Sequence, residues 1–314
     1  MHRALSVKVD PCDDQPTSGH YAPHATREEP SPVCRSLDSG ALIAADPLGN
    51  DASSFALALH ASESSPPSVR IGIVQINTMP NASTQFYLAL NGDARAVIEL
   101  STADSAQLGR VQQEIDDLDC WCKVLAVRPE SVALQNALRE ATVGLFLLAS
   151  GLYRSAFVSL RLFLELSLAS VHFSVNRLEL AEWLRGTRDV NWGALIDGDE
   201  GVLSIRYASA FFPELRDSIR TYNAIGSKAY RELSEFVHGN HHTLGDVNGR
   251  IAFNAELQTQ WLDLFESAST VVGYSLCLRF LKELPRTDLG TLAPNVGAAL
   301  GHIEAVRDYL RIPS

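Results

Sequence analysis

The sequence predicts a mainly α-helical protein, and three observations support this fold class. From about residue 102 almost to the C-terminus, apolar residues recur at steps of three and four. Hydrophobic residues make up 46% and charged residues 20% of the 314 positions, so the chain can bury a substantial core. Alternating apolar patterns are confined to a short stretch before this region. We therefore predict an α-helical bundle domain over 102–314, a small antiparallel β-sheet element over 67–101 and a disordered lead over 1–66.

The lead is rich in Pro, Ser, Asp and Ala and shows no sustained period, which is typical of a disordered segment. Its first residues, MHRALSVKVDPCDD, contain no continuous apolar stretch of the kind found in secretory signals. The five cysteines are odd in number and form no disulfide framework. These features predict a cytoplasmic protein with reduced thiols.

The sheet element is predicted from three short runs. SVRIGIVQI (68–76) has the composition of a strand, and QFYLAL (85–90) and ARAVIEL (94–100) flank the sequence Asn91-Gly92-Asp93. Asn and Gly accept positive φ angles, so this tripeptide indicates a hairpin turn between the last two strands.

Helices account for the rest of the prediction. Pro213 is expected to precede the first turn of one of them, and Gly239 is expected to end it. Residues 155–175 come nearest to a membrane span, but Arg161, Glu165 and His172 would be costly at a bilayer centre, so we predict a core helix and no membrane partner. The predicted helices cover 101–126, 131–151, 153–175, 178–186, 214–239, 254–284 and 295–310, with a turn or short helix at 192–197.

The helix over 214–239 carries the candidate chemistry. Its apolar stripe consists of Leu215, Ile219, Tyr222, Gly226, Ala229, Leu233 and Phe236. Arg231, Glu235 and His238 fall on a different face. Arg231 and His238 are nearly two full turns apart, so they project the same way at a separation of roughly 10 Å along the axis, and both could reach one phosphate-sized group.

The segment AYRELSEFVHGN resembles the Arg-x4–6-His signature of the HEPN superfamily, helical-bundle proteins of prokaryotic defence and toxin–antitoxin systems. The form here is Arg231, six residues, then His238. The resemblance implies a HEPN-like bundle and a metal-independent endoribonuclease that works as a homodimer on RNA, with an antitoxin or defence-system partner. Arg231 and His238 would be the active pair, contributed by both subunits at their interface. Glu232 stands where the family more often has Asn, Asp or His.

This chemistry suits the two residue types. Metal-independent RNA cleavage uses the 2′-hydroxyl as nucleophile, which requires a proton acceptor and a group that stabilises phosphate charge. Histidine titrates near neutral pH, and a guanidinium binds phosphate bidentately. A structural alternative exists, because a histidine in a last turn complements the helix dipole and Arg231 with Glu235 forms a surface i,i+4 pair. The same helix would then serve a non-catalytic dimerisation or interaction module.

Further polar residues are auxiliary candidates: Glu232, Ser234, Glu235, Asn240, His241, His242, Arg161 and Glu165. His238, His241 and His242 offer three imidazoles, but adjacent histidines rarely face one ion and no acidic or cysteine ligand completes a set, so no metal and no cofactor are predicted. Arg161 and Glu165 are interpreted as a core ion pair; the alternative is that one of them faces the same cleft as His238. Tyr153 and Arg154 are weaker candidates for that cleft.

Charge and motifs narrow the function classes. A net charge of −11 argues against a general nucleic-acid binder, although residues 139–250 are nearly balanced, with 12 Lys and Arg against 13 Asp and Glu. The chain contains no Walker loop, G-x-G-x-x-G, G-x-S-x-G or H-E-x-x-H sequence. The commonest nucleotide-binding, hydrolase and metalloprotease motifs are therefore absent.

Overall fold

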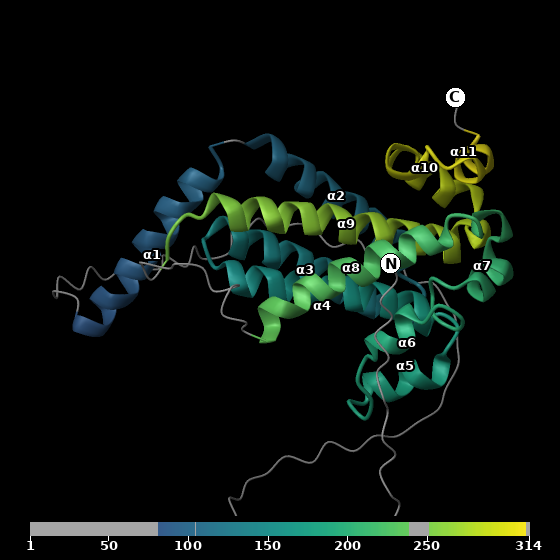
Figure 1. The fold of residues 1–314 in the computed structure, drawn as a ribbon, viewed down its shortest axis with the longest axis horizontal. Helices are drawn as coiled ribbons and strands as arrows, with labels where there is room; N and C mark the ends of the chain where they lie inside the picture. The colour runs from purple at the N-terminus through teal and green to yellow at the C-terminus, as the bar shows by residue number, and fades with distance from the viewer. Residues whose placement is uncertain (1–80, 104, 239–250, 312–314) are drawn as a thin grey trace, which may run out of the picture. The chain divides into compact units, whose positions relative to one another are not determined.

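Helices make up most of the chain that the structure, a computed structural model, describes (Figure 1). The described residues are 81–103, 105–238 and 251–311, and they belong to one unit, Val74–Ser314. These residues form eleven α-helices and two short 3-10 helices, with no strand among them. The prediction of a mainly helical protein is confirmed. The predicted lead over 1–66 and the predicted strand over 68–76 lie outside the described residues.

The predicted β-hairpin over 85–100 is wrong, because this segment is the helix α1, Ala82–Ser101. The Asn81 side chain caps the helix by accepting a hydrogen bond from the backbone N–H of Thr84 at 2.8 Å. Phe86, Leu90, Ala94 and Val97 follow one another at steps of four, four and three, which is a helical period. Asn91-Gly92-Asp93 lies inside the helix. The helical period and the alanines therefore outweigh the turn signal.

After α1, the chain forms one helix and then a hairpin of two helices joined at Gly151. Gly151 connects its two arms with a φ of +76°, and a side chain there would come within 3.1 Å of Val97 in α1. Only glycine combines this left-handed conformation with so close an approach. The elements are α2 (Ser105–Val124) and the hairpin arms α3 (Ser131–Ala149) and α4 (Tyr153–Phe173). The two predicted arms joined near Gly151 are confirmed.

Short helices separate this hairpin from the candidate helix. They are α5 (Arg177–Leu184), α6 (Trp192–Ile196), α7 (Ile205–Phe211) and the 3-10 helix η1 (Pro213–Leu215). The predicted helix over 214–239 is interrupted after η1, and α8 runs from Ile219 to His238. The Leu215 carbonyl accepts hydrogen bonds from the hydroxyl of Tyr274 and the backbone N–H of Ser218. The chain therefore turns before α8 begins.

The C-terminal helices differ from the prediction at their ends. They are α9 (Ala255–Phe280), the 3-10 helix η3 (Leu281–Glu283), α10 (Arg286–Leu300) and α11 (Glu304–Leu310). The single helix predicted over 295–310 is two helices that separate after Leu300, and α10 begins nine residues earlier than predicted. Pro294 lies inside α10. The predicted start at residue 295 directly follows this proline, a residue type that usually interrupts a helix.

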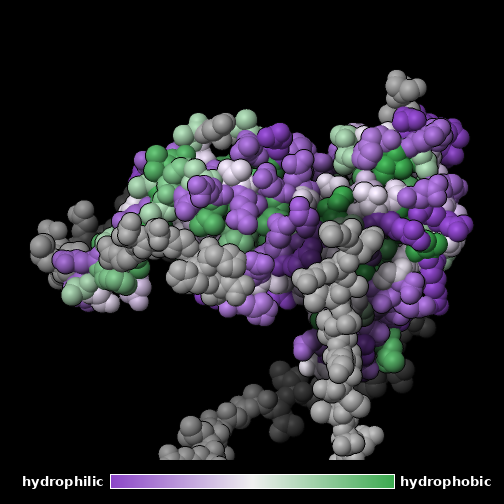
Figure 2. Space-filling model, in the orientation of Figure 1, coloured by the Kyte–Doolittle hydropathy of each residue, from purple (hydrophilic) through white to green (hydrophobic). Residues whose placement is uncertain are grey.

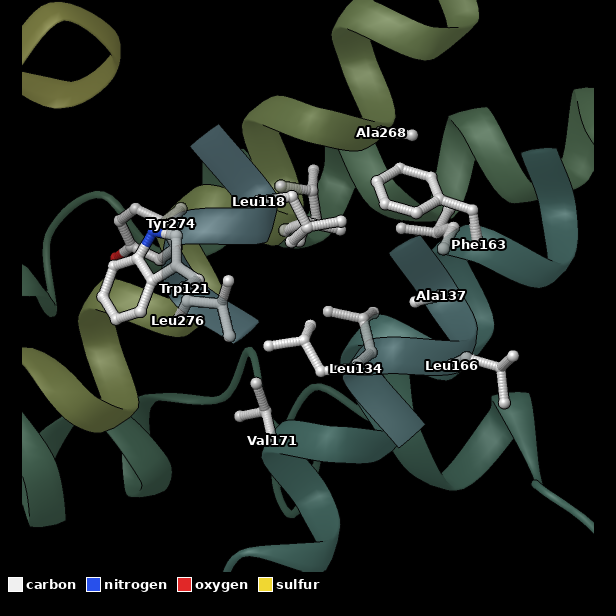
Figure 3. Close-up of a cluster of buried hydrophobic side chains, with 14 of the residues drawn as sticks. Leu118, Trp121, Leu134, Ala137, Phe163, Leu166, Val171, Ala268, Tyr274 and Leu276 are labelled. Atoms are coloured by element: carbon white, nitrogen blue, oxygen red, sulfur yellow. The ribbon is translucent and has the colours of Figure 1, made fainter. Parts of the chain in front are cut away.

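The core lies between α2, α3, α4, α8 and α9. Figure 3 shows part of it, with Leu118 and Trp121 of α2, Phe163 of α4 and Tyr274 of α9 around a shared interior. Hydrophilic residues cover most of the helical surface seen in Figure 2. Among the described helices, α4 alone is long and apolar enough to cross a membrane, and 72% of its most apolar window is buried within the bundle. Its burial confirms the interpretation as a core helix.

The junction of α4 with α8 yields a stability prediction. Phe157 and Phe236 stack with ring centroids 3.6 Å apart, and Phe236 is only 3% exposed. We expect Phe236→Ala to lower the free energy of unfolding by about 3–5 kcal/mol, since it leaves a cavity in the core. Phe146→Ala is the matched control because Phe146 is 63% exposed. Urea unfolding followed by circular dichroism measures both, and equal losses would contradict this role of the stack.

Candidate functional site

The helix α8 presents one buried and one open face. The predicted apolar stripe is confirmed, because its members from Ile219 to Phe236 are buried. Gly226 allows α9 to approach, since a Cβ atom at this position would lie 3.3 Å from Val271. Packing against α4 and α9 therefore fixes the rotation of α8 about its own axis. This rotation determines which side chains reach solvent.

Arg231 and His238 both lie on the open face and are exposed. Among the described residues, the side chain of neither one forms a hydrogen bond or an ion pair. Arg231 therefore does not form the i,i+4 pair with Glu235 that the structural alternative expects. Glu232 instead faces Lys228, with the Nζ and Oε1 atoms 3.8 Å apart, and the Ser234 hydroxyl donates to the Tyr230 carbonyl at 2.7 Å. Among the described residues, nothing therefore occupies the hydrogen-bonding groups of the Arg231 and His238 side chains.

Arg154, at the start of α4, contacts the C-terminal end of α8. Its Nε atom donates to the Phe236 carbonyl at 3.1 Å and its Nη2 atom donates to the Val237 carbonyl at 3.2 Å. A cation at this end of a helix complements the macrodipole. Arg154 therefore adds to the role that the structural alternative assigns to His238, which itself lies in the last turn of α8. It also adds an exposed guanidinium within one turn of His238 along α8.

Arg161 and Glu165 form a polar network with α8, two turns before His238. The Tyr230 hydroxyl donates to Glu165 Oε1 at 2.7 Å and accepts a hydrogen bond from Arg161, whose Nη2 atom lies 3.3 Å from the same Glu165 oxygen. The Arg161 guanidinium also lies over the Tyr230 ring, and Trp192 stacks on that ring with centroids 3.8 Å apart. Burial, followed by the bond to Glu165, raises the pKa of Tyr230.

This network matches the interpretation of Arg161 and Glu165 as a structural ion pair. Both side chains are partly buried, at 21% and 18% exposure, and both point to Tyr230. Tyr230 precedes His238 by roughly 12 Å along the helix axis. Arg161 and Glu165 are therefore committed to the α4–α8 contact. Trp192, which sequence reasoning treated only as part of a turn or short helix, covers the outer side of the network.

The remaining candidates fall outside the described residues or away from α8. Asn240, His241 and His242, together with the expected stop at Gly239, lie outside the described part of the chain. Within the described part, no group of three His, Cys, Asp or Glu side chains has the arrangement of a metal site. Cys122 and Cys277 are buried thiols, and burial raises the pKa of Cys122 to about 12.

No family model, curated protein or solved structure matches this chain.

The network yields a prediction about coupling. Glu165→Leu leaves the partly buried Arg161 without its carboxylate, so we expect the free energy of unfolding to fall by about 1–3 kcal/mol. The double variant Arg161→Leu/Glu165→Leu removes both charges and should lose less than the sum of the two single variants. Chemical unfolding of the four proteins gives the coupling free energy. Additive losses would show that the two charges stabilise the fold independently.

An exposed pair of the same spacing provides the control. Arg95 and Glu99 in α1 are 3.5 Å apart but are 81% and 72% exposed. Replacing either residue by leucine, or both, should show little coupling, because solvent screens the charges.

Proposed function

We propose that this chain is a HEPN-like, metal-independent endoribonuclease that acts as a homodimer, with Arg231 and His238 as its active pair. One observation carries the proposal: both side chains are exposed on the open face of α8 and have no partner among the described residues. The buried stripe on the other side of α8 holds this face outward. The Arg-x6-His form within AYRELSEFVHGN supplies the family resemblance.

The proposed reaction assigns a distinct role to each residue. The His238 imidazole accepts the proton of an RNA 2′-hydroxyl, whose oxygen attacks the adjacent phosphorus. The bond from phosphorus to the 5′-oxygen breaks, and an imidazolium returns a proton to that oxygen. The products are a 2′,3′-cyclic phosphate and a 5′-hydroxyl end. Arg231 binds the non-bridging phosphate oxygens and stabilises the charge that develops on them.

A homodimer would complete this site. In one chain, Arg231 and His238 lie on the open face of α8 and line neither the cavity of about 390 Å³ nor that of about 90 Å³ in the described part of the molecule. Two α8 faces related by a two-fold axis would enclose the RNA between two such pairs, one imidazole acting as base and the other as acid. Arg154 would add positive charge at the same end of α8. An antitoxin or defence-system partner would act by covering this face.

The proposal is tested by RNA cleavage with EDTA present. We expect the wild-type protein to cut RNA and leave 2′,3′-cyclic phosphate ends, and we expect Arg231→Ala and His238→Ala each to lose about 100-fold or more in rate. Arg220→Ala is the matched control, because Arg220 is also exposed on α8 but lies about five turns from His238. Expression of the same variants, with cellular RNA integrity as readout, tests the activity in cells.

Two results would overturn the proposal. Intact RNA in the presence of the wild-type protein, both in cells and in vitro, would reject the nuclease activity. Equal cleavage by the wild-type protein and both alanine variants would reject the site.

A non-catalytic dimerisation or interaction module is the second candidate, and an exposed apolar surface favours it. The arms α3 and α4 expose Val143, Phe146, Val158 and Leu162, with Phe146 63% exposed. Such residues are typical of the centre of a protein–protein contact. Under this alternative the α3–α4 surface would form the dimer and α8 would have no chemical role.

Sedimentation distinguishes the two candidates. A dimer that dissociates in Phe146→Asp, combined with intact RNA, supports the module. A dimer that persists in Phe146→Asp and cleaves RNA supports the nuclease with an interface elsewhere.

A further inference from the structure

A cavity of about 390 Å³ lies between α2, α9 and α10, and it includes no residue of α8. Its volume falls in the range of small-molecule sites. Its inner wall is apolar and buried, and consists of Leu118, Trp121, Ala141, Phe163, Phe265, Val272, Leu276, Val296 and Leu300. Figure 3 shows Leu118, Trp121, Phe163 and Leu276 from this wall within the core. The cavity is therefore continuous with the interior of the bundle and suits an apolar group.

The charged residues that line the cavity are all acidic. Glu114 and Asp117 come from α2 and Glu266 comes from α9, and no Lys, Arg or His is among the lining residues. Glu114 accepts a hydrogen bond from the Ser269 hydroxyl, which fixes its carboxylate at the wall. Burial is the largest influence on Glu114 and raises its pKa, and Glu266 and Asp117 act in the same direction. The hydrogen bond from Ser269 and the charge of Arg110 act in the opposite direction. Arg110 lines an adjoining cavity of about 90 Å³ that shares Glu114 and Glu266 with the larger one, and it is not among the residues that line the larger cavity.

We propose that this cavity binds a small organic cation, a molecule with an apolar body and a protonated amine. The apolar body would contact the inner wall, and the ammonium group would lie among the carboxylates of Glu114, Asp117 and Glu266. Carboxylates beside an apolar wall favour a cation strongly, because the low-polarity surroundings strengthen the attraction. The amide of Asn295, from α10, adds a neutral hydrogen-bonding group to the lining.

Gly273 explains how this space arises within a packed bundle. It lies inside α9 and lines the cavity, and a Cβ atom built on it meets no other atom within 4 Å. Glycine in the middle of a helix is less stable than alanine by about 0.5–1 kcal/mol, so this residue costs stability while leaving the cavity open. Ala298 and Ala299 line the cavity from α10 with short side chains. Small residues on both facing helices therefore define its width.

The experiment compares three probes of one shape and different charge. These are 4-phenylbutylamine, 4-phenylbutan-1-ol and 4-phenylbutyrate, each titrated into the full chain by calorimetry, with the thermal midpoint as a second readout. We expect the amine to bind at least tenfold more tightly than the alcohol and the carboxylate to bind least. Glu114→Gln retains the acceptor for Ser269 but removes the charge. It should weaken amine binding at least fivefold and leave alcohol binding unchanged.

A filled-cavity variant separates binding from folding. Gly273→Leu places a side chain in the open space, so we expect it to fold with a thermal midpoint no lower than that of the wild type and to lose amine binding at least tenfold. Gly109→Leu is the matched control, since Gly109 lies in α2, is exposed, has equally open surroundings and does not line the cavity. It should retain amine binding.

Three results would overturn the proposal. One is no binding of the amine at millimolar concentration, and another is binding of all three probes with equal affinity, which would indicate a merely apolar groove. The third is unchanged amine affinity in a folded Gly273→Leu protein. None of these measurements depends on RNA cleavage, so the cation site and the proposed nuclease stand or fall separately.

Discussion

The fold depends on the need to cover α4. This helix is apolar around most of its circumference, and only other helices can remove so much apolar surface from water. The arm α3 covers one side through the hairpin, and α8 and α9 cover the others, although they lie far away in the sequence. The positions of the later helices follow from this requirement. The orientation of α8, and hence of its open face, is a consequence of packing on α4.

Two charged residues interrupt this apolar helix, and their placement shows how the bundle accommodates them. Arg161 and Glu165 lie at the edge between α4 and α8, where the Tyr230 hydroxyl joins them. A phenol both donates and accepts, so one side chain completes the pair. Trp192 stacks on the ring of the same tyrosine. The α4–α8 contact thus combines aromatic stacking at Phe236 with a polar contact at Tyr230, and the two fix the register of the helices.

Most of the long helices could be predicted from the sequence, whereas a local turn or proline signal concealed α1 and the start of α10. The stripe from Ile219 to Phe236 indicated both the helix and its buried face. The segment containing Asn91-Gly92-Asp93 was assigned to a hairpin because a local turn signal was given more weight than the helical spacing of Phe86, Leu90 and Ala94. Pro294 concealed the first part of α10 in the same way. A local residue preference misleads where neighbouring residues favour continuing the helix.

The candidate sites also differ in how far sequence alone could predict them, depending on whether their residues come from one helix or from several. The shared face of Arg231 and His238 follows from helical geometry within one element, so sequence could predict it. The pairing of Arg161 with Glu165 was predicted for the same reason, but Tyr230 was not, since it comes from another helix. The cavity between α2, α9 and α10 was not predictable, because α2 is more than 100 residues away from α9 and α10 in the chain. Its defining feature, the open space beside Gly273, is an absence of side chains.

Consecutive residues of α4 hold both ends of the connection between α8 and α9. Arg154 binds the Phe236 and Val237 carbonyls, and the Tyr153 hydroxyl accepts a hydrogen bond from the Asn254 backbone N–H at 2.8 Å. Neighbouring residues of α4 therefore hold the last turn of α8 and the residue that caps α9. A connection with fixed ends can change in length and composition at small entropic cost, since the closure term grows only with the logarithm of loop length. Evolution can thus vary the sequence that follows His238 without changing the bundle that supports α8.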